Sequence, residues 1–161
     1  MAPTILPVRA KSDLTFALHA ASAQCSETND PDDAEVTILR CAEVVIVAEA
    51  SAVRSSLLSM SSHPRTIQLD AGAIAVSMGS SASLFTVQTS DAIVSAREGE
   101  WFVAAESGRS VAATWRGTVT KWLRSDGSES VLQSGGADPG GVAPGRLARL
   151  RAALERSRSR R

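Results

Sequence analysis

The sequence predicts an all-β fold, a sandwich or roll of short antiparallel strands, with an amphipathic helix at the C-terminal end. Three observations carry this prediction. Between residues 65 and 136, short apolar runs recur about every eight to twelve residues and each is closed by a turn residue. Within the runs, apolar and polar residues alternate, as in strands with one buried and one wetter face. After residue 136, leucines recur with helical spacing.

The expected strands follow from the turn residues that separate them. Glycines stand between the apolar runs, because tight turns need backbone conformations that glycine adopts without strain. Asp126 and Gly127 give the clearest two-residue hairpin signal. We expect strands at Thr66–Asp70, Ala73–Met78, Leu84–Thr89, Ala92–Arg97, Glu100–Ala105, Ser110–Trp115 and Thr118–Leu123, and a weaker eighth at Glu129–Gln133.

Five short motifs in this region occur in a familiar order. They are Leu69-Asp70-Ala71-Gly72, Phe85-Thr86-Val87-Gln88-Thr89, Gly99-Glu100-Trp101-Phe102-Val103, Gly117-Thr118-Val119 and Leu132-Gln133-Ser134-Gly135. In order and spacing they resemble the β-rich FecR domain of bacterial envelope signalling proteins, although Glu100 stands where that family usually has Thr. The resemblance covers residues 34–136, because the stretch from Glu35 to Met60 is similar to the opening strands of the same unit.

Two stretches before residue 65 are rich in Val and Ile. Glu35–Leu39 and Glu43–Ala48 favour strands for that reason, while Ala50–Met60 fits either a strand or a helical turn. The second stretch is apolar on both of its faces, so we expect a central strand that is covered twice. Its two sets of alternate residues are Val44, Ile46 and Ala48 on one face, and Val45 and Val47 on the other.

Residues 1–33 form an N-terminal arm in this interpretation. Arg9 and Lys11 precede the apolar stretch Leu14–Ala23, which ends in small residues as a secretory signal does, but His19 interrupts it. We therefore interpret it as a short helix or a poorly ordered arm, with a weak signal segment as the alternative. Glu27–Asp33 is polar and acidic and is interpreted as a linker.

Residues 137–161 are interpreted as a Gly/Pro linker followed by a basic helical tail. The helix is expected at Arg146–Arg156, with Leu147, Leu150 and Leu154 on one face. The chain has no net charge, but the part after residue 136 carries +5 and the part before it −5. Because an isolated helix this short is marginal in water, we expect it to dock weakly or fray, and residues 34–136 to be the folding core.

Trp101 and Trp122 are the candidate partner contacts. By alternation, Trp101 lies opposite Phe102, which we expect to be buried. Aromatic side chains on the wetter face of a sheet often mark a partner or ligand surface. The alternative is that a second layer, such as the C-terminal helix, covers both tryptophans, while Trp115 belongs to the core.

The sequence predicts no catalytic, cofactor or metal site. His63 and Asp70 lie near serines, but no Gly-x-Ser-x-Gly nucleophile turn is present. Two His and two Cys without close spacing do not make a metal site, and no phosphate-cradling or dinucleotide glycine motif occurs. Cys25 and Cys41 would pair in an oxidising compartment, whereas Cys41 would be a small core residue in a reducing one.

The resemblance implies a non-enzymatic module for envelope sensing and signalling or protein interaction, with a receptor or a sigma-factor pathway component as protein partner. It implies a location in the periplasm or cell envelope, with the cytoplasm as the alternative. No apolar run reaches the roughly 18 residues of a membrane span, and the basic tail lacks a nucleic-acid reading motif. The alternative is a carbohydrate-binding or structural β-module that uses Trp101 and Trp122 as a stacking platform; a small hydrolase is a third reading.

Overall fold

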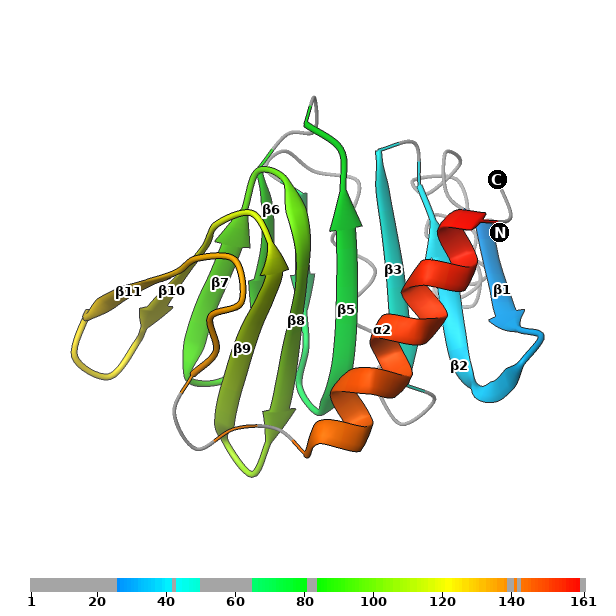
Figure 1. Ribbon diagram of the computed structural model, residues 1–161. Coiled ribbons are helices and arrows are strands. Elements are labelled where there is room, and N and C mark those ends of the chain that lie inside the picture. The colour runs from blue at the N-terminus through cyan, green and yellow to red at the C-terminus, as the bar shows by residue number, and fades with distance from the viewer. Residues whose placement is uncertain are drawn as a thin grey trace, which may run out of the picture.

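The computed structural model describes residues 26–41, 43–49, 65–80, 84–138, 141 and 143–159. Within these ranges, eleven strands form two sheets, and helix α2 (Pro144–Ser159) lies across the outer face of one of them (Figure 1). The molecule therefore has three layers: a five-stranded sheet, a six-stranded sheet and a helix. The predicted all-β fold with a C-terminal helix is confirmed.

The larger sheet has six strands in the order β1-β2-β3-β5-β8-β9, and each neighbouring pair is antiparallel. Most of its connections are short turns, so strands close in sequence are also close in space. The strands are β1 (Ser26–Asp30), β2 (Asp33–Arg40), β3 (Val44–Glu49), β5 (Gly72–Met78), β8 (Gly99–Glu106) and β9 (Arg109–Arg116).

The smaller sheet has five strands in the order β11-β10-β7-β6-β4, antiparallel except for the parallel pair β4 and β6. Every strand that the sequence predicts within the described ranges is present, with its ends within two residues of the expected ones. Ala50–Met60 lies outside the described residues. The strands of this sheet are β4 (Arg65–Gln68), β6 (Phe85–Gln88), β7 (Ala92–Ala96), β10 (Val119–Leu123) and β11 (Glu129–Leu132).

The main core lies between the two sheets. Alternate residues of both sheets point into it, and Phe85 of β6 meets Trp101 of β8 edge to face with ring centroids 6.1 Å apart. The largest fully buried side chains of this core also include Ile46, Ile67, Leu69 and Met78.

A second core lies between the six-stranded sheet and α2. Leu150, Ala153 and Leu154 of the helix are buried against the outer face of β2, β3 and β5 and against Phe102. Strand β3 contributes Val44 and Ile46 to the first core and Val45 and Val47 to the second, so the prediction of a strand covered on both faces is confirmed. The burial of Phe102 is confirmed as well.

The position of the helix over Trp101 and Trp122 is wrong, whereas its weak docking stays a prediction. Helix α2 packs on the opposite face of the six-stranded sheet from Trp101, and its nearest tryptophan is Trp115, which is half-buried beside it. Phe102 and Trp115 meet edge to face at 6.3 Å, and the guanidinium of Arg151 lies over the Trp115 ring at 5.5 Å. The helix is thus a layer of the fold.

The interpretation of Glu27–Asp33 as a linker is also wrong. Residues 26–30 form β1, which pairs with β2 at the end of the six-stranded sheet. Its side chains are polar and mostly exposed, and only Asp30 is buried. Polar and charged residues are common on edge strands, where they discourage pairing with other chains, so the hydrophobic pattern gives no sign of such a strand.

Replacing Gly99 by Ala is expected to lower the free energy of unfolding by about 1–3 kcal/mol. Gly99 has φ of +107°, and a Cβ added there would lie 2.1 Å from the carbonyl oxygen of Arg116. Gly79→Ala is the matched control, because nothing lies within 4 Å of a Cβ at that position. Urea unfolding of the two variants checks this, and equal effects would contradict the close approach of the backbone at Gly99.

Candidate interaction surface

Trp101 does not lie on a surface. Its side chain is fully buried between the two sheets, so the expected exposed position of Trp101 is wrong. The period-two pattern assigns one wetter face to each strand, but the six-stranded sheet has the second sheet on one side and α2 on the other. A second layer does cover Trp101, and that layer is the five-stranded sheet.

Trp122 lies on the outer face of the five-stranded sheet. In β10, Val119 points into the core between the sheets and Lys121 is buried, whereas Trp122 is 38% exposed. Val131 on the neighbouring strand β11 is 52% exposed. The register pairs Trp122 with Glu129 and places Val131 two residues further along β11, so both apolar side chains lie on one face. We call this pair the Trp122 patch.

The rest of this face carries almost no charge. The register places Ile93 of β7 beside Trp122, on the side away from β11, and uncharged polar residues follow across β7, β6 and β4. Such a face can be covered by a partner without desolvating ion pairs, and aromatic residues with few charges are typical of the centre of protein interfaces. The uncharged polar residues are Thr66, Gln68, Thr86, Gln88, Ser95 and Thr120, while Glu129 marks the charged end.

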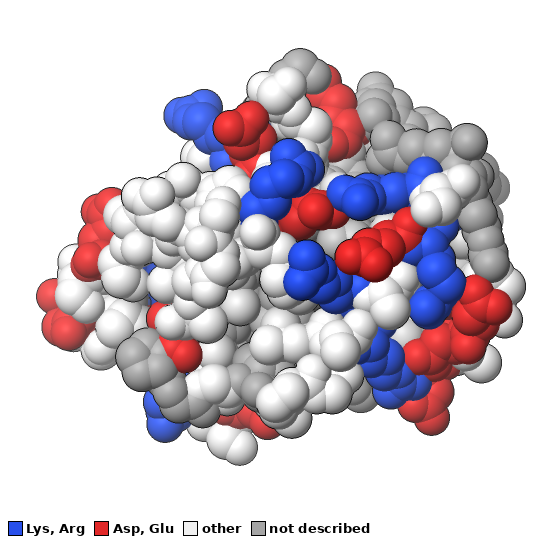
Figure 2. Space-filling view, viewed as in Figure 1, with Lys and Arg blue, Asp and Glu red and all other residues white. Residues whose placement is uncertain are grey.

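The helix side of the molecule has the opposite character. Lys, Arg, Asp and Glu crowd together over α2 and the adjoining strands, while most of the surface toward β9–β11 is white in the same view (Figure 2). Each arginine of α2 within the described residues has a carboxylate partner. The pairs are Arg146 with Glu49 and Glu106, Arg149 with Asp33 and Glu35, Arg151 with Glu155, Arg156 with Asp30 and Asp32, and Arg158 with Glu100.

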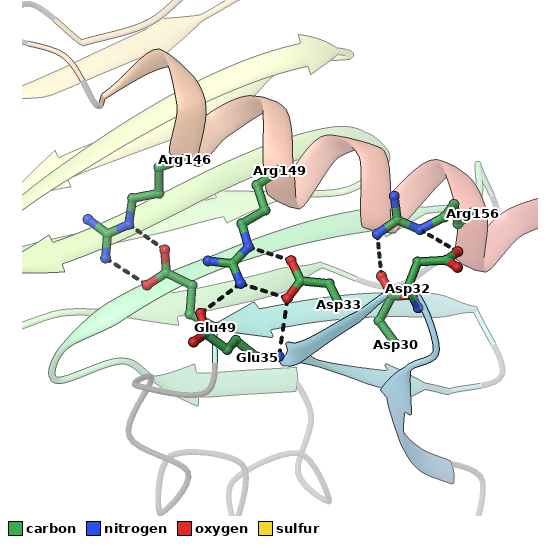
Figure 3. Close-up of polar contacts among 8 residues, drawn as sticks. All are labelled: Asp30, Asp32, Asp33, Glu35, Glu49, Arg146, Arg149 and Arg156. Carbon is green, nitrogen blue, oxygen red and sulfur yellow. Dashed lines mark hydrogen bonds and ion pairs between the residues drawn. The ribbon is translucent and has the colours of Figure 1, made fainter.

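Except for the pair of Arg151 and Glu155, which lies within the helix, these ion pairs join α2 to the sheet; Figure 3 draws those of Arg146, Arg149 and Arg156. Arg146 binds Glu49 through two nitrogens, the second at 2.8 Å, and its hydrogen bonds to Glu49 raise its pKa above the ordinary value. Hydrogen bonding to Asp33 likewise raises the pKa of Arg149, and Arg149 in turn lowers the pKa of Asp33. The positive charge of the helix is therefore largely used within the chain, and the helix does not present a free basic surface.

The outer edge of β9 is closed by polar groups from other elements. Lys121 Nζ donates to the carbonyl of Ser110 at 2.8 Å and to Asp138 Oδ2 at 2.7 Å. Asp138 Oδ2 also accepts the amide of Ala112 at 2.8 Å, and Asp91 Oδ2 accepts that of Ser110 at 3.1 Å. Further along, Thr114 exchanges two backbone hydrogen bonds with residues 135 and 136. The backbone groups of β9 are thus paired on both sides of the strand.

Acid is expected to destabilise the chain in part through Asp91. Burial alone would raise the pKa of this carboxyl, but hydrogen bonds from Ser110 and Thr89 outweigh burial and hold it below its usual value. Because the pKa of this carboxyl is lower in the folded state, its ionised form stabilises the fold at pH values above the unfolded-state pKa of about 3.9. This stabilisation is lost as the pH falls through the folded-state pKa. Asp91→Asn should therefore lose less stability than wild type between about pH 5 and 3, measured by urea unfolding. If the free energies of unfolding of Asp91→Asn and wild type fell equally over this pH range, the expectation would be contradicted.

The described residues offer no group of three or more His, Cys, Asp or Glu side chains that could hold a metal ion. Helix α2 has 16 residues with arginines throughout, and no described helix is long and apolar enough to cross a membrane. His63 lies outside the described residues.

Cys41 at the end of β2 is disulfide-bonded. The only other cysteine of the sequence is Cys25, which lies outside the described residues. The antiparallel register of β1 and β2 ends at the pair of Ser26 and Arg40, so Cys41 directly follows the last paired residue of β2. Disulfides persist mainly in oxidising compartments.

Comparisons with known proteins identify one family. The model of the family described as FecR protein matches residues 20–120. Two solved structures of a putative anti-sigma factor from Parabacteroides distasonis ATCC 8503 are similar, each at 16% identity over 68% of this chain, with TM-scores of 0.41 and 0.39. The chain spans 47% of the length of those proteins. No curated protein matches the chain.

Proposed function

The chain belongs to the FecR family, and from this premise we propose that it is a non-enzymatic protein-interaction module of an envelope signalling pathway. The observation that carries the proposal is the Trp122 patch, two exposed apolar side chains that lie with Ile93 on a nearly uncharged face. A partner that covers this patch would remove apolar surface from water and break no ion pair. By resemblance, the partner is a receptor or a component of a sigma-factor pathway.

The surface over helix α2 is less suited to binding a partner than the Trp122 patch, which supports the same proposal. Its arginines are engaged by carboxylates of the chain, so binding there would first have to break several charge-assisted hydrogen bonds. The five-stranded sheet carries no such network on its outer face among the described residues. The partner therefore meets the chain on the side away from α2.

The proposed location is the periplasm or cell envelope. The disulfide of Cys41 supports an oxidising compartment, since a bond of this kind is rarely kept in the cytosol. Alkylation of the protein in intact cells, followed by mass spectrometry under non-reducing conditions, tests this. A free Cys41 thiol in cells would contradict the proposed location.

Photocrosslinking tests the proposed function. A photoreactive phenylalanine analogue replaces Trp122 in one variant and Arg151 in a matched control, because Arg151 is exposed on the helix side. In cells that express the protein natively, the analogue at 122 is expected to give one dominant protein adduct, which mass spectrometry identifies as an envelope receptor or sigma-factor regulator. Equal adducts at both positions, or an adduct unrelated to envelope signalling, would reject the proposal.

The carbohydrate-binding alternative loses its platform in this fold. It needs two aromatic rings side by side on one face, but Trp101 is buried between the sheets and Trp122 lies on an outer face. A single exposed tryptophan gives one stacking surface only. Binding to a glycan array that depends on Trp122 would restore this alternative.

A further inference from the structure

The two sheets differ in how their edges are protected. The outer edge of β9 is closed by Asp91, Lys121, Asp138 and residues 135–136. Strands β1 and β4 adjoin segments outside the described residues. Strand β11 ends the five-stranded sheet, has β10 as its single strand partner within the described chain, and is exposed along most of its length. In Figure 1 the β10–β11 hairpin projects from the body of the molecule on the side away from α2.

The register shows which backbone groups of β11 face outward. The amide of Leu123 donates to the carbonyl of Ser128 at 2.9 Å, so these two residues form a hydrogen-bonded pair. Hydrogen-bonded and non-hydrogen-bonded pairs alternate along an antiparallel ladder. Ser130 and Leu132 therefore bond toward β10, and the amides and carbonyls of Glu129 and Val131 point away from the sheet.

We propose that the free edge of β11 binds an extended segment of the partner protein, which adds a strand to the five-stranded sheet. This inference rests on the proposed function and names how the Trp122 patch is used. Four outward backbone groups supply the main-chain hydrogen bonds, and the side chains of Trp122 and Val131 lie on the face beside the added strand. Side-chain alternation in the partner then places every second residue over this face.

Charge at this end of the sheet defines the chemistry of the partner segment. Glu129 and Asp126 are exposed in the β10–β11 hairpin, and no described residue forms an ion pair with either carboxylate. The segment that fits has an aliphatic or aromatic residue against the Trp122 patch and Lys or Arg near Glu129. Opposite charges across neighbouring strands stabilise the pairing, and an acidic segment would be repelled.

Peptide selection on the purified full chain tests this proposal. A phage library of random dodecapeptides is panned on the protein, and selected peptides are measured by fluorescence anisotropy. We expect enrichment of segments that alternate β-branched or aromatic residues with polar ones and carry Lys or Arg. An absence of enriched peptides, or enrichment of acidic or helix-forming ones, would overturn the proposal.

Three variants separate main-chain from side-chain recognition. Val131→Pro removes one outward amide but no hydrogen bond to β10, and is expected to lower the affinity for the selected peptides at least about tenfold. Val131→Thr keeps the amide and a similar side-chain shape, so it should lower the affinity clearly less. Glu129→Lys should shift the selected peptides from basic to acidic. If Val131→Pro unfolds, as circular dichroism would show, the Glu129→Lys shift alone decides the outcome.

The outcomes are distinguishable from those of the proposed function. A crosslinked envelope partner at position 122 without edge-dependent peptide binding keeps the proposed function and rejects strand addition. Edge-dependent peptide binding without such a partner keeps strand addition and rejects the signalling role. A dimer in sedimentation that Val131→Pro abolishes would make a second copy of the chain the occupant and overturn the proposed partner.

Discussion

A chain that ends at residue 143, without α2, is expected to lose its cooperative thermal unfolding transition. The deletion removes Leu150 and Leu154, which are buried against the six-stranded sheet, and uncovers Phe102 and its neighbours in β3 and β5. Each large-to-small change at such a leucine typically costs about 2–5 kcal/mol. Losing both is comparable with the whole stability of an ordinary domain, about 5–15 kcal/mol.

Graded variants of the helix separate packing from charge. Leu150→Ala and Leu154→Ala are each expected to lower the free energy of unfolding by about 2–5 kcal/mol. Leu147→Ala is the matched control, because Leu147 is only partly buried, and it should cost less. The division of the chain at residue 136, proposed from the strand pattern, gives the opposite expectation: residues 34–136 alone would melt cooperatively. Differential scanning calorimetry of the shortened chain decides between the two.

The strands of this fold could be predicted because local rules fix them. Between residues 65 and 136, glycines and hairpin signals set the strand ends, and alternation sets the faces. The position of β3 was also predictable, since Val44, Val45, Ile46 and Val47 leave no polar face for water. In each case the information lies within a few residues of the element.

The order of the layers depends on contacts between distant segments, which the pattern does not contain. Trp101 and Phe102 are neighbours in β8, and alternation predicts the wetter face for Trp101, because it fits a sheet with a single buried face. In the structure both are fully buried, one under each layer. Likewise, β1 is held by pairing with β2, and its polar residues gave no hydrophobic signal.

The candidate site was half predictable. Alternation in β10 put Trp122 on the exposed side, and its exposure agrees with that position. Val131 completes the patch only through the β10–β11 register, although the Asp126-Gly127 turn already signalled a hairpin that would bring the two strands together. The partners of the helix arginines could not be paired from the sequence, because Asp30, Asp33 and Glu49 lie about 100 residues or more from them.

Replacing Lys121 by Met is expected to lower the free energy of unfolding by about 3–5 kcal/mol, the usual cost of removing one partner of a buried ion pair. The side chains of Lys121 and Asp138 are only 8% and 13% exposed, and their atoms meet at 2.7 Å. Methionine fills the space of the lysine stem but leaves the Asp138 carboxylate without its cation and the Ser110 carbonyl without a donor.

The double variant Lys121→Met with Asp138→Asn isolates the charge in this pair. Asparagine removes the unpaired carboxylate and can still accept the amide of Ala112, so the double variant should regain part of the stability that Lys121→Met loses. Urea unfolding at neutral pH measures all three proteins, and hydrogen exchange follows the amides of Ser110 and Ala112. A loss below about 1 kcal/mol for Lys121→Met, typical of an exposed pair, would contradict the argument. Faster exchange at Ala112 is expected in the single variant, because the Lys121–Asp138 pair is what closes this part of the β9 edge.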